Sequence, residues 1–149
     1  MARIVAVCLS DTKAVSKKPV DGGFLRENYG LVGDAHASPG ADRQVSLLST
    51  DSIEKMRRLG VELSAGDFAE NLTVEGMDLV SLPIGTQLAL GKSVILEVIQ
   101  IGKECHSRCA VYRQVGKCVM PEEGVFARVI HGGLVKAGDQ IRRRRLGGE

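Results

Sequence analysis

Short apolar runs interrupted by glycine are the feature of this chain that most limits what it can fold into. Valine, isoleucine and leucine recur in runs of a few residues, and 18 glycines are spread along the chain. Aromatic residues make up only 3% of the chain, and tryptophan is absent. Runs of this length suit strands joined by tight turns better than helices, which need longer apolar patterns. The sequence therefore predicts a mainly β fold.

Seven segments have the length and composition of strands. They lie at residues 3–10, 43–49, 71–75, 86–90, 93–101, 125–130 and 139–144. The segment 93–101 is mostly apolar on both faces, although Glu97 interrupts one of them, as a barrel strand covered outside by a helix would be. Seven or so strands in one small domain indicate a barrel or a sandwich.

One helix is predicted at residues 51–59. Ser49 and Thr50 can cap its start, and a glutamate follows Asp51 by three residues. Gly60 supplies a C-terminal stop. Ile53, Met56 and Leu59 would share one face of this helix.

Length and composition favour a single domain, residues 1–149, with a core of ordinary size. Hydrophobic residues make up 44% and charged residues 26%, as in globular proteins. No apolar run approaches the roughly 18 residues of a membrane helix, so we expect no membrane association. The start of the chain is too short and too polar for a secretory signal, which predicts a cytoplasmic protein whose thiols stay reduced.

The charge of the chain gives little indication of a charged partner. The net charge is +2, too small to predict nucleic-acid binding. The strongest charge run is the four arginines at 142–145. Runs of like charge at a terminus are often disordered, so residues 142–149 are predicted to form a basic, flexible tail.

Three of the four cysteines gather in one short stretch among basic side chains. The thiols are Cys105, Cys109 and Cys118, and the cations are Lys103, Arg108, Arg113 and Lys117. A thiolate is the reactive form of cysteine, and neighbouring cations lower its pKa. The stretch therefore suits sulfur or metal chemistry on an anion. Cys8, by contrast, lies in an apolar run and is predicted to be buried as a small hydrophobe.

A second short helix is predicted near residues 107–116. If it forms, Cys109 lies in its first turn, where the helix dipole favours a thiolate. The alternative for the three thiols is a zinc site, with His106 or His36 as the fourth ligand. The spacing lacks the paired C-x2-C motifs of ordinary structural zinc sites, so zinc is the less favoured interpretation. A disulfide under oxidising conditions is a further alternative.

Several side chains are donors of the kind that a phosphate and the edge of a heterocyclic ring require. These candidate binding residues are Arg43, Gln44, Ser46, Asn71, Thr73, Arg108 and Arg113. Bracing of a barrel loop is an equal alternative for Arg43 and Asn71, and a solvated helix face is one for Arg113. His36 is a candidate proton-transfer residue because it titrates near neutral pH. For the nearby Asp34, capping of its own turn is the favoured interpretation.

Taken together and in order, seven short motifs resemble the MOSC domain, and the resemblance covers nearly the whole chain. The motifs are GDAH at 33–36, RQVSLL at 43–48, GDFAENLT at 66–73, LPIG at 82–85, SRC at 107–109, GVFAR at 124–128 and GD at 138–139. The chain is similar to the small free-standing bacterial members. The resemblance implies a closed, mainly β barrel of about seven strands with a few short helices.

The resemblance also implies one cysteine that carries sulfur as a persulfide or ligates molybdenum in a bound cofactor. Cys109 matches it best, because the SRC triplet resembles the stretch around the molybdenum-ligating cysteine of amidoxime-reducing members. Cys105 is the alternative. Cys118 is a candidate resolving thiol, which would attack a persulfide or sulfenate at Cys109.

The leading functional hypothesis is a sulfur carrier or cofactor-binding protein of molybdenum-cofactor (molybdopterin) metabolism, with the cofactor bound permanently or transiently. One alternative is a molybdenum-dependent reductase of N-hydroxylated compounds that draws electrons from partner proteins. Another is a zinc-stabilised barrel used as an interaction module. Expected partners are a cysteine desulfurase-like sulfur donor and proteins of molybdopterin biosynthesis or molybdoenzymes. Pyridoxal phosphate would belong to the sulfur donor, not to this chain.

Overall fold

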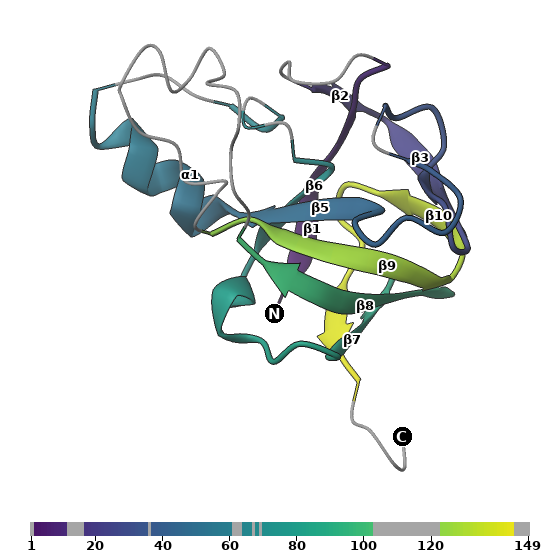
Figure 1. Ribbon diagram of the computed structural model, residues 1–149. Helices are drawn as coiled ribbons and strands as arrows, with labels where there is room; N and C mark the ends of the chain where they lie inside the picture. The colour runs from purple at the N-terminus through teal and green to yellow at the C-terminus, as the bar shows by residue number, and fades with distance from the viewer. Residues whose placement is uncertain are drawn as a thin grey trace.

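An eight-stranded sheet forms the body of the molecule in the computed structural model (Figure 1). The structure describes residues 2–11, 17–35, 37–60, 64–66, 68, 70–102 and 123–144. The strands of the sheet are β1 (Arg3–Leu9), β2 (Lys18–Val20), β5 (Val45–Ser49), β6 (Leu72–Glu75), β7 (Gln87–Leu90), β8 (Val94–Ile101), β9 (Val125–His131) and β11 (Ile141–Arg143). All seven predicted strands are confirmed, with ends that shift by two residues or fewer.

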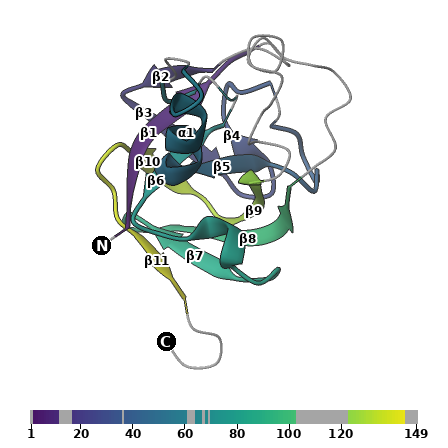
Figure 2. The same ribbon diagram turned by 90° about the vertical axis from the view of Figure 1, so that its left-hand side faces the viewer.

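The sheet follows the order β11-β7-β8-β9-β5-β6-β1-β2. Neighbouring strands are antiparallel except β5 and β6, which pair in parallel. Its curvature wraps it around the core (Figure 2). Strand β11 takes in Arg142 and Arg143, so the ordered sheet extends into the basic run that ends the chain.

The prediction of a closed barrel is wrong, because the main sheet is an open half-barrel. Its edge strands β11 and β2 do not pair with each other. Backbone hydrogen bonds link the start of β1 to the turn before β11, including Ile4 N to Asp139 O at 2.8 Å and Gly138 N to Ile4 O at 2.7 Å. This contact stays short because β11 has only three residues and the far end of β1 is paired with β2.

A second sheet of three strands was not predicted. It contains β10 (Gly133–Lys136), β3 (Gly22–Arg26) and β4 (Gly30–Leu31), in that order. Glycines begin all three strands, and this composition normally weakens a strand prediction. At Gly23 space favours glycine, since a Cβ there would lie 2.6 Å from Leu31 Cδ1 and would force that buried side chain to shift.

Alternating apolar side chains of both sheets fill the core. In β8, Val94, Leu96 and Val98 are buried, whereas the intervening side chains are partly exposed. The β3 residue Leu25 and the β10 residue Val135 join the same core from the small sheet. The two sheets therefore share one hydrophobic interior.

Helix α1 (Thr50–Arg57) follows β5 directly (Figure 1). Ser49 caps it as predicted, because its Oγ accepts a hydrogen bond from Asp51 N at 3.1 Å. Gly60 ends the turn with φ +92°, which also agrees with the prediction. The helix ends two residues earlier than expected. A single 3-10 turn, η1, spans Leu79–Ser81. No helix in the described ranges is long and apolar enough to span a membrane.

Candidate functional site

The cysteine-bearing stretch leaves the sheet between β8 and β9. At this point Gly102 N donates a hydrogen bond to Gly124 O at 2.7 Å, and Ile101 pairs with Val125. The predicted site residues Cys105, Arg108, Cys109, Arg113 and Cys118, with the predicted short helix, fall within residues 103–122 and lie outside the described residues, as does His36. The structure therefore fixes where this stretch begins and ends.

Arg43 reaches back along β9 to Phe126, the second residue of that strand. Its guanidinium carbon is 5.6 Å from the centroid of the Phe126 ring, within the range of a cation–π contact. Phe126 directly follows Val125, the first residue of β9, and is paired with Ser46 of β5 and Gln100 of β8. Arg43 is exposed, so its donors are accessible to a ligand.

Helix α1 is tied to the same place by Glu123, which precedes β9 by two residues. The Glu123 carboxylate accepts a hydrogen bond from Ser52 Oγ at 2.6 Å and pairs with Lys55 Nζ at 3.0 Å. The end of the cysteine stretch is thus held by α1 through Glu123, and both of its ends meet at the hydrogen bond between Gly102 and Gly124.

The predicted binding residues Asn71 and Ser46 form a buried polar bracket between β1 and β5. Asn71 Oδ1 accepts from Ser46 N at 3.1 Å and from Ser46 Oγ at 3.3 Å. Asn71 Nδ2 donates to Cys8 O at 3.2 Å. Asn71 is 1% exposed, so its side chain is committed to holding these strands. Cys8 is buried, as predicted.

Gln44 is also buried and hydrogen-bonded within the protein. Its Nε2 donates to Asn28 Oδ1 at 3.0 Å and to Ala41 O at 2.8 Å. Its Oε1 accepts from Val129 N at 3.0 Å. Gln44 therefore fixes the loop that carries Arg43 against β9.

Asp34 forms a buried ion pair that sequence reasoning did not find. Its Oδ1 lies 2.7 Å from Lys17 Nζ, with both side chains 1% exposed, and accepts from Ser10 N at 3.1 Å. The pair joins the start of β2 to the loop after β4, and the bond from Ser10 N links that loop to the end of β1. The sequence does not indicate that Lys17 is buried, because it follows a polar stretch that is typical of a surface loop.

Glu70 is the second residue that sequence reasoning missed, because glutamate is a residue type that is almost never fully buried. It is fully buried, and its Oε2 accepts from Thr73 Oγ1 at 2.7 Å and from Gly66 N at 3.1 Å. Its Oε1 has no hydrogen-bond partner among the described residues. Burial raises the pKa of the Glu70 carboxyl above its ordinary value of 4.5, although the hydrogen bond from Thr73 opposes this shift.

Replacement of Glu70 by glutamine should remove a pH-dependent loss of stability. Because the pKa is raised in the folded state, folding favours the protonated carboxyl, whose stabilising contribution is complete below the unfolded-state pKa. That contribution is lost as the pH rises through the folded-state pKa. We expect the free energy of unfolding of Glu70→Gln to lack this decline, measured by urea unfolding at a series of pH values. The exposed Glu54→Gln is the control, and an unchanged pH slope in Glu70→Gln would contradict the assignment.

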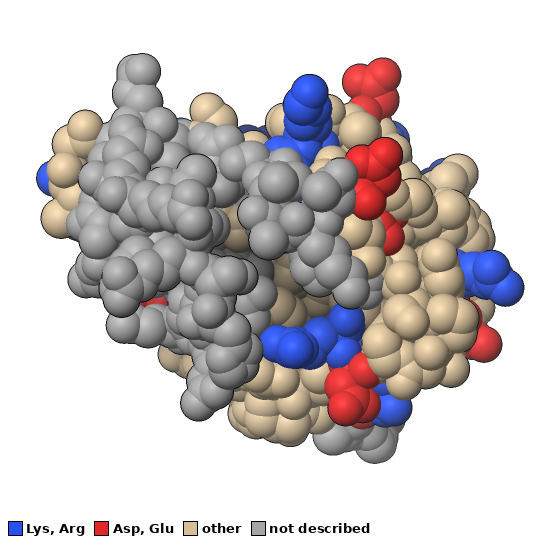
Figure 3. All heavy atoms as spheres, turned by 45° about the horizontal axis from the view of Figure 1, so that its top comes forward, with Lys and Arg blue, Asp and Glu red and all other residues tan. Residues whose placement is uncertain are grey.

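The described residues offer little to a metal ion. No group of three or more histidine, cysteine, aspartate or glutamate side chains in the described ranges could hold one. On the face drawn in Figure 3, basic and acidic side chains are interspersed over the described surface. Among the predicted donors that the structure describes, Arg43 is the exposed one.

The chain belongs to the MOSC domain family, because the family model for the MOSC domain matches residues 33–142. The match takes in the loop of Asp34 and Arg43, the Asn71 bracket and the whole cysteine stretch. A comparison with curated protein sequences finds no match.

Solved structures share the fold. The YUAD protein from Bacillus subtilis is 22% identical with a TM-score of 0.78, and the match covers 94% of this chain and 93% of that one. YiiM from Geobacillus stearothermophilus is 18% identical with a TM-score of 0.73, covering 97% and 76%. YiiM from Escherichia coli is 20% identical with a TM-score of 0.67, covering 100% and 72%.

Proposed function

We propose that the protein serves molybdenum-cofactor metabolism through a reactive cysteine in residues 103–122, with Cys109 as the working thiol and Cys105 as the alternative. The thiol would carry sulfur as a persulfide or ligate the molybdenum of a bound cofactor. The observation that supports this proposal is the position of Arg43, an exposed cation whose guanidinium lies over Phe126, near the start of the strand that follows the cysteine stretch. Membership of the MOSC family supports it as well.

The predicted donors fit the cofactor only in part. Arg43 suits a contact with its phosphate, because an exposed guanidinium can grip phosphate through two parallel bonds. Gln44, Ser46, Asn71 and Thr73 are buried and already hydrogen-bonded, so we assign them to holding the loop and strands in place. When bound, the cofactor would supply the redox chemistry of molybdenum, for which a cysteine thiolate is a suitable soft ligand.

As a carrier, the thiolate would take the terminal sulfur from the persulfide of a cysteine desulfurase-like partner. The thiolate attacks that sulfur, a new S–S bond forms, and the S–S bond of the donor breaks. The donor leaves as a thiolate, so the transfer needs no outside oxidant or reductant. Pyridoxal phosphate would act in the donor, where the sulfur is first released from cysteine.

Sulfur loading tests the proposed thiol. After incubation with a cysteine desulfurase and cysteine, we expect intact-protein mass spectrometry to show one added sulfur in the wild type and in Cys118→Ser. Cys109→Ser should show none, because serine has a similar size but cannot form a persulfide. Loss of loading in Cys105→Ser instead would move the role to Cys105. Zinc bound at one per chain, with no loading and no molybdenum, would contradict the proposal in favour of a zinc-stabilised module.

Arg43→Ala should weaken cofactor binding by about 1.5–3 kcal/mol, because it removes a charged hydrogen bond to phosphate. This corresponds to a rise in Kd of roughly 10- to 100-fold. The matched control is Arg26→Ala, because the Arg26 guanidinium also packs over an aromatic ring, 5.4 Å from the centroid of Tyr29, but lies in the small sheet. Equal binding by wild type and Arg43→Ala would contradict the assignment of Arg43.

A further inference from the structure

An exposed apolar row crosses the three-stranded sheet. Leu134 of β10 pairs with Phe24 of β3, and Val32, just after β4, donates its backbone N–H to Phe24 O at 3.0 Å. These three side chains are neighbours on adjacent strands, with exposures of 74%, 46% and 46%. Large side chains exposed singly are ordinary, but a continuous row is a feature of interaction surfaces.

The row lies on the face of the small sheet that points away from the core. Alternation along the strands directs Leu25, Leu31 and Val135 inward, where each is 1% exposed or less. The opposite face has no covering layer among the described elements. The inner face of the small sheet therefore packs against the core, whereas its outer face has exposed apolar side chains at its centre.

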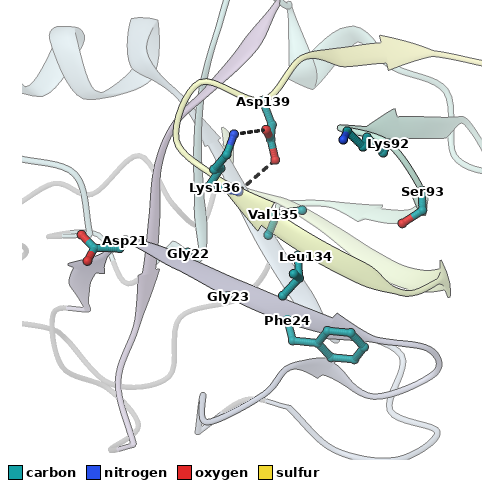
Figure 4. A pocket seen from close by; sticks show the side chains of 10 residues that line it. All are labelled: Asp21, Gly22, Gly23, Phe24, Lys92, Ser93, Leu134, Val135, Lys136 and Asp139. Carbon is teal, nitrogen blue, oxygen red and sulfur yellow. Dashed lines mark hydrogen bonds and ion pairs between the residues drawn. The ribbon is translucent and has the colours of Figure 1, made fainter.

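A groove of about 670 Å³ runs along this face (Figure 4). Gly22 and Gly23 line it without side chains, next to the apolar side chains of Phe24 and Leu134. The turn that joins β7 to β8 forms another wall through Lys92 and Ser93. The groove can therefore receive an apolar side chain that approaches from outside.

Opposite charges lie toward the two ends of the groove. Asp21 precedes β3 at the end where Gly22 pairs with Lys136, whereas Lys92 lies beside Ser93 and the start of β10. Both are exposed, and neither side chain has a hydrogen-bond or ion-pair partner within the described residues. Lys136, by contrast, pairs with Asp139 at 3.3 Å. Figure 4 shows Asp21 and Lys92 on opposite sides of Leu134.

We propose that this face is the interface of a two-fold symmetric homodimer. In such an interface the same patch meets itself, so residues at one end contact residues at the other end of the second copy. A two-fold axis near Leu134 places Asp21 of each copy against Lys92 of the other. Leu134 of each copy then packs against Phe24 and the groove of its neighbour. A second copy is favoured over other occupants because the pattern is self-complementary. The acidic Asp21 and the basic Lys92 lie on either side of an apolar centre, so a two-fold rotation brings opposite charges together.

The apolar centre is tested by sedimentation equilibrium at protein concentrations from about 1 µM to about 1 mM. We expect a dimer for the wild type and at least about a 100-fold weaker dimer for Leu134→Asp, which would bury two carboxylates at the axis. Ile84→Asp is the matched control, because Ile84 is 61% exposed but lies in the turn before β7, at the opposite end of the β7–β8 hairpin from Lys92. It should leave the dimer unchanged.

The charge pattern allows a test by mixing. Asp21→Lys alone presents cations at both ends, and Lys92→Asp alone presents anions at both ends, so each variant should form homodimers about tenfold more weakly than the wild type. A mixture of the two should form heterodimers at wild-type strength, and the double variant should recover the homodimer.

Three outcomes would overturn the proposal. The first is a wild type that stays monomeric up to the highest concentration. The second is a dimer that Leu134→Asp leaves intact. The third is a mixture of Asp21→Lys and Lys92→Asp that associates no better than either variant alone. Thermal unfolding of each variant distinguishes loss of the dimer from loss of the fold.

Discussion

Lys17→Met should lower the free energy of unfolding by about 3–5 kcal/mol, because it leaves the buried Asp34 carboxylate without its cation. Methionine retains most of the length and apolar character of the lysine stem, so the expected loss comes from the charge rather than from a cavity. Urea unfolding followed by circular dichroism measures it. The effect should be among the largest that removal of a single charged group produces in this domain.

Two comparisons isolate the buried ion pair. Arg57→Met removes an exposed ion pair with Glu54 at 3.2 Å and should cost about 1 kcal/mol or less. The double variant Lys17→Met with Asp34→Asn should be more stable than Lys17→Met alone, because no charge is then left buried. Equal losses of free energy of unfolding for Lys17→Met and Arg57→Met would show that the buried Lys17–Asp34 pair matters no more than an exposed one.

Asn71→Ala should lower the free energy of unfolding by about 2–4 kcal/mol. The substitution removes the acceptor that Asn71 offers to Ser46 N and the donor that it offers to Cys8 O, and both bonds are buried. A buried polar group that loses its partner costs about 1–3 kcal/mol, and two are affected here. Urea unfolding at neutral pH measures the loss.

Ser81→Ala provides the comparison for Asn71. Its hydroxyl donates to Asp78 Oδ2 at 2.6 Å, but both side chains are exposed, so water can replace the lost bond. We expect a change within about 0.5 kcal/mol. If Asn71→Ala were equally mild, the bracket between β1 and β5 would not be a main source of stability.

The main sheet could be predicted because its strands carry the apolar pattern in their own residues. Strand β8 is an example, since Val94, Leu96 and Val98 are buried and alternate with partly exposed residues. The small sheet could not be predicted for the opposite reason. In β3, two glycines replace the apolar alternation, and only the packing of Gly23 against Leu31 shows why they are there. The openness of the main sheet was equally hidden, because it depends on the three-residue length of β11.

The candidate site could be predicted from the sequence only in part. Residue type identifies Gln44, Asn71 and Thr73 as donors, but it does not reveal that neighbouring strands already use their hydrogen bonds. Lys17 is a residue type that is almost always exposed, so its burial against Asp34 depends on contacts between distant segments. Arg43 is the donor for which residue type and position agree.

The hydrogen bond between Gly102 and Gly124 makes the β8–β9 connection a position where one loop sequence can replace another. Because the two glycines already hold the strand ends together, the register of β8 with β9 does not depend on what the chain does between them. The entropy of closing a loop grows only slowly with its length. Relatives could therefore lengthen, shorten or rewrite this connection at little cost to the sheet. The same scaffold could accept a transplanted loop with a different chemistry, which would let sequence change quickly there while the surrounding strands change slowly.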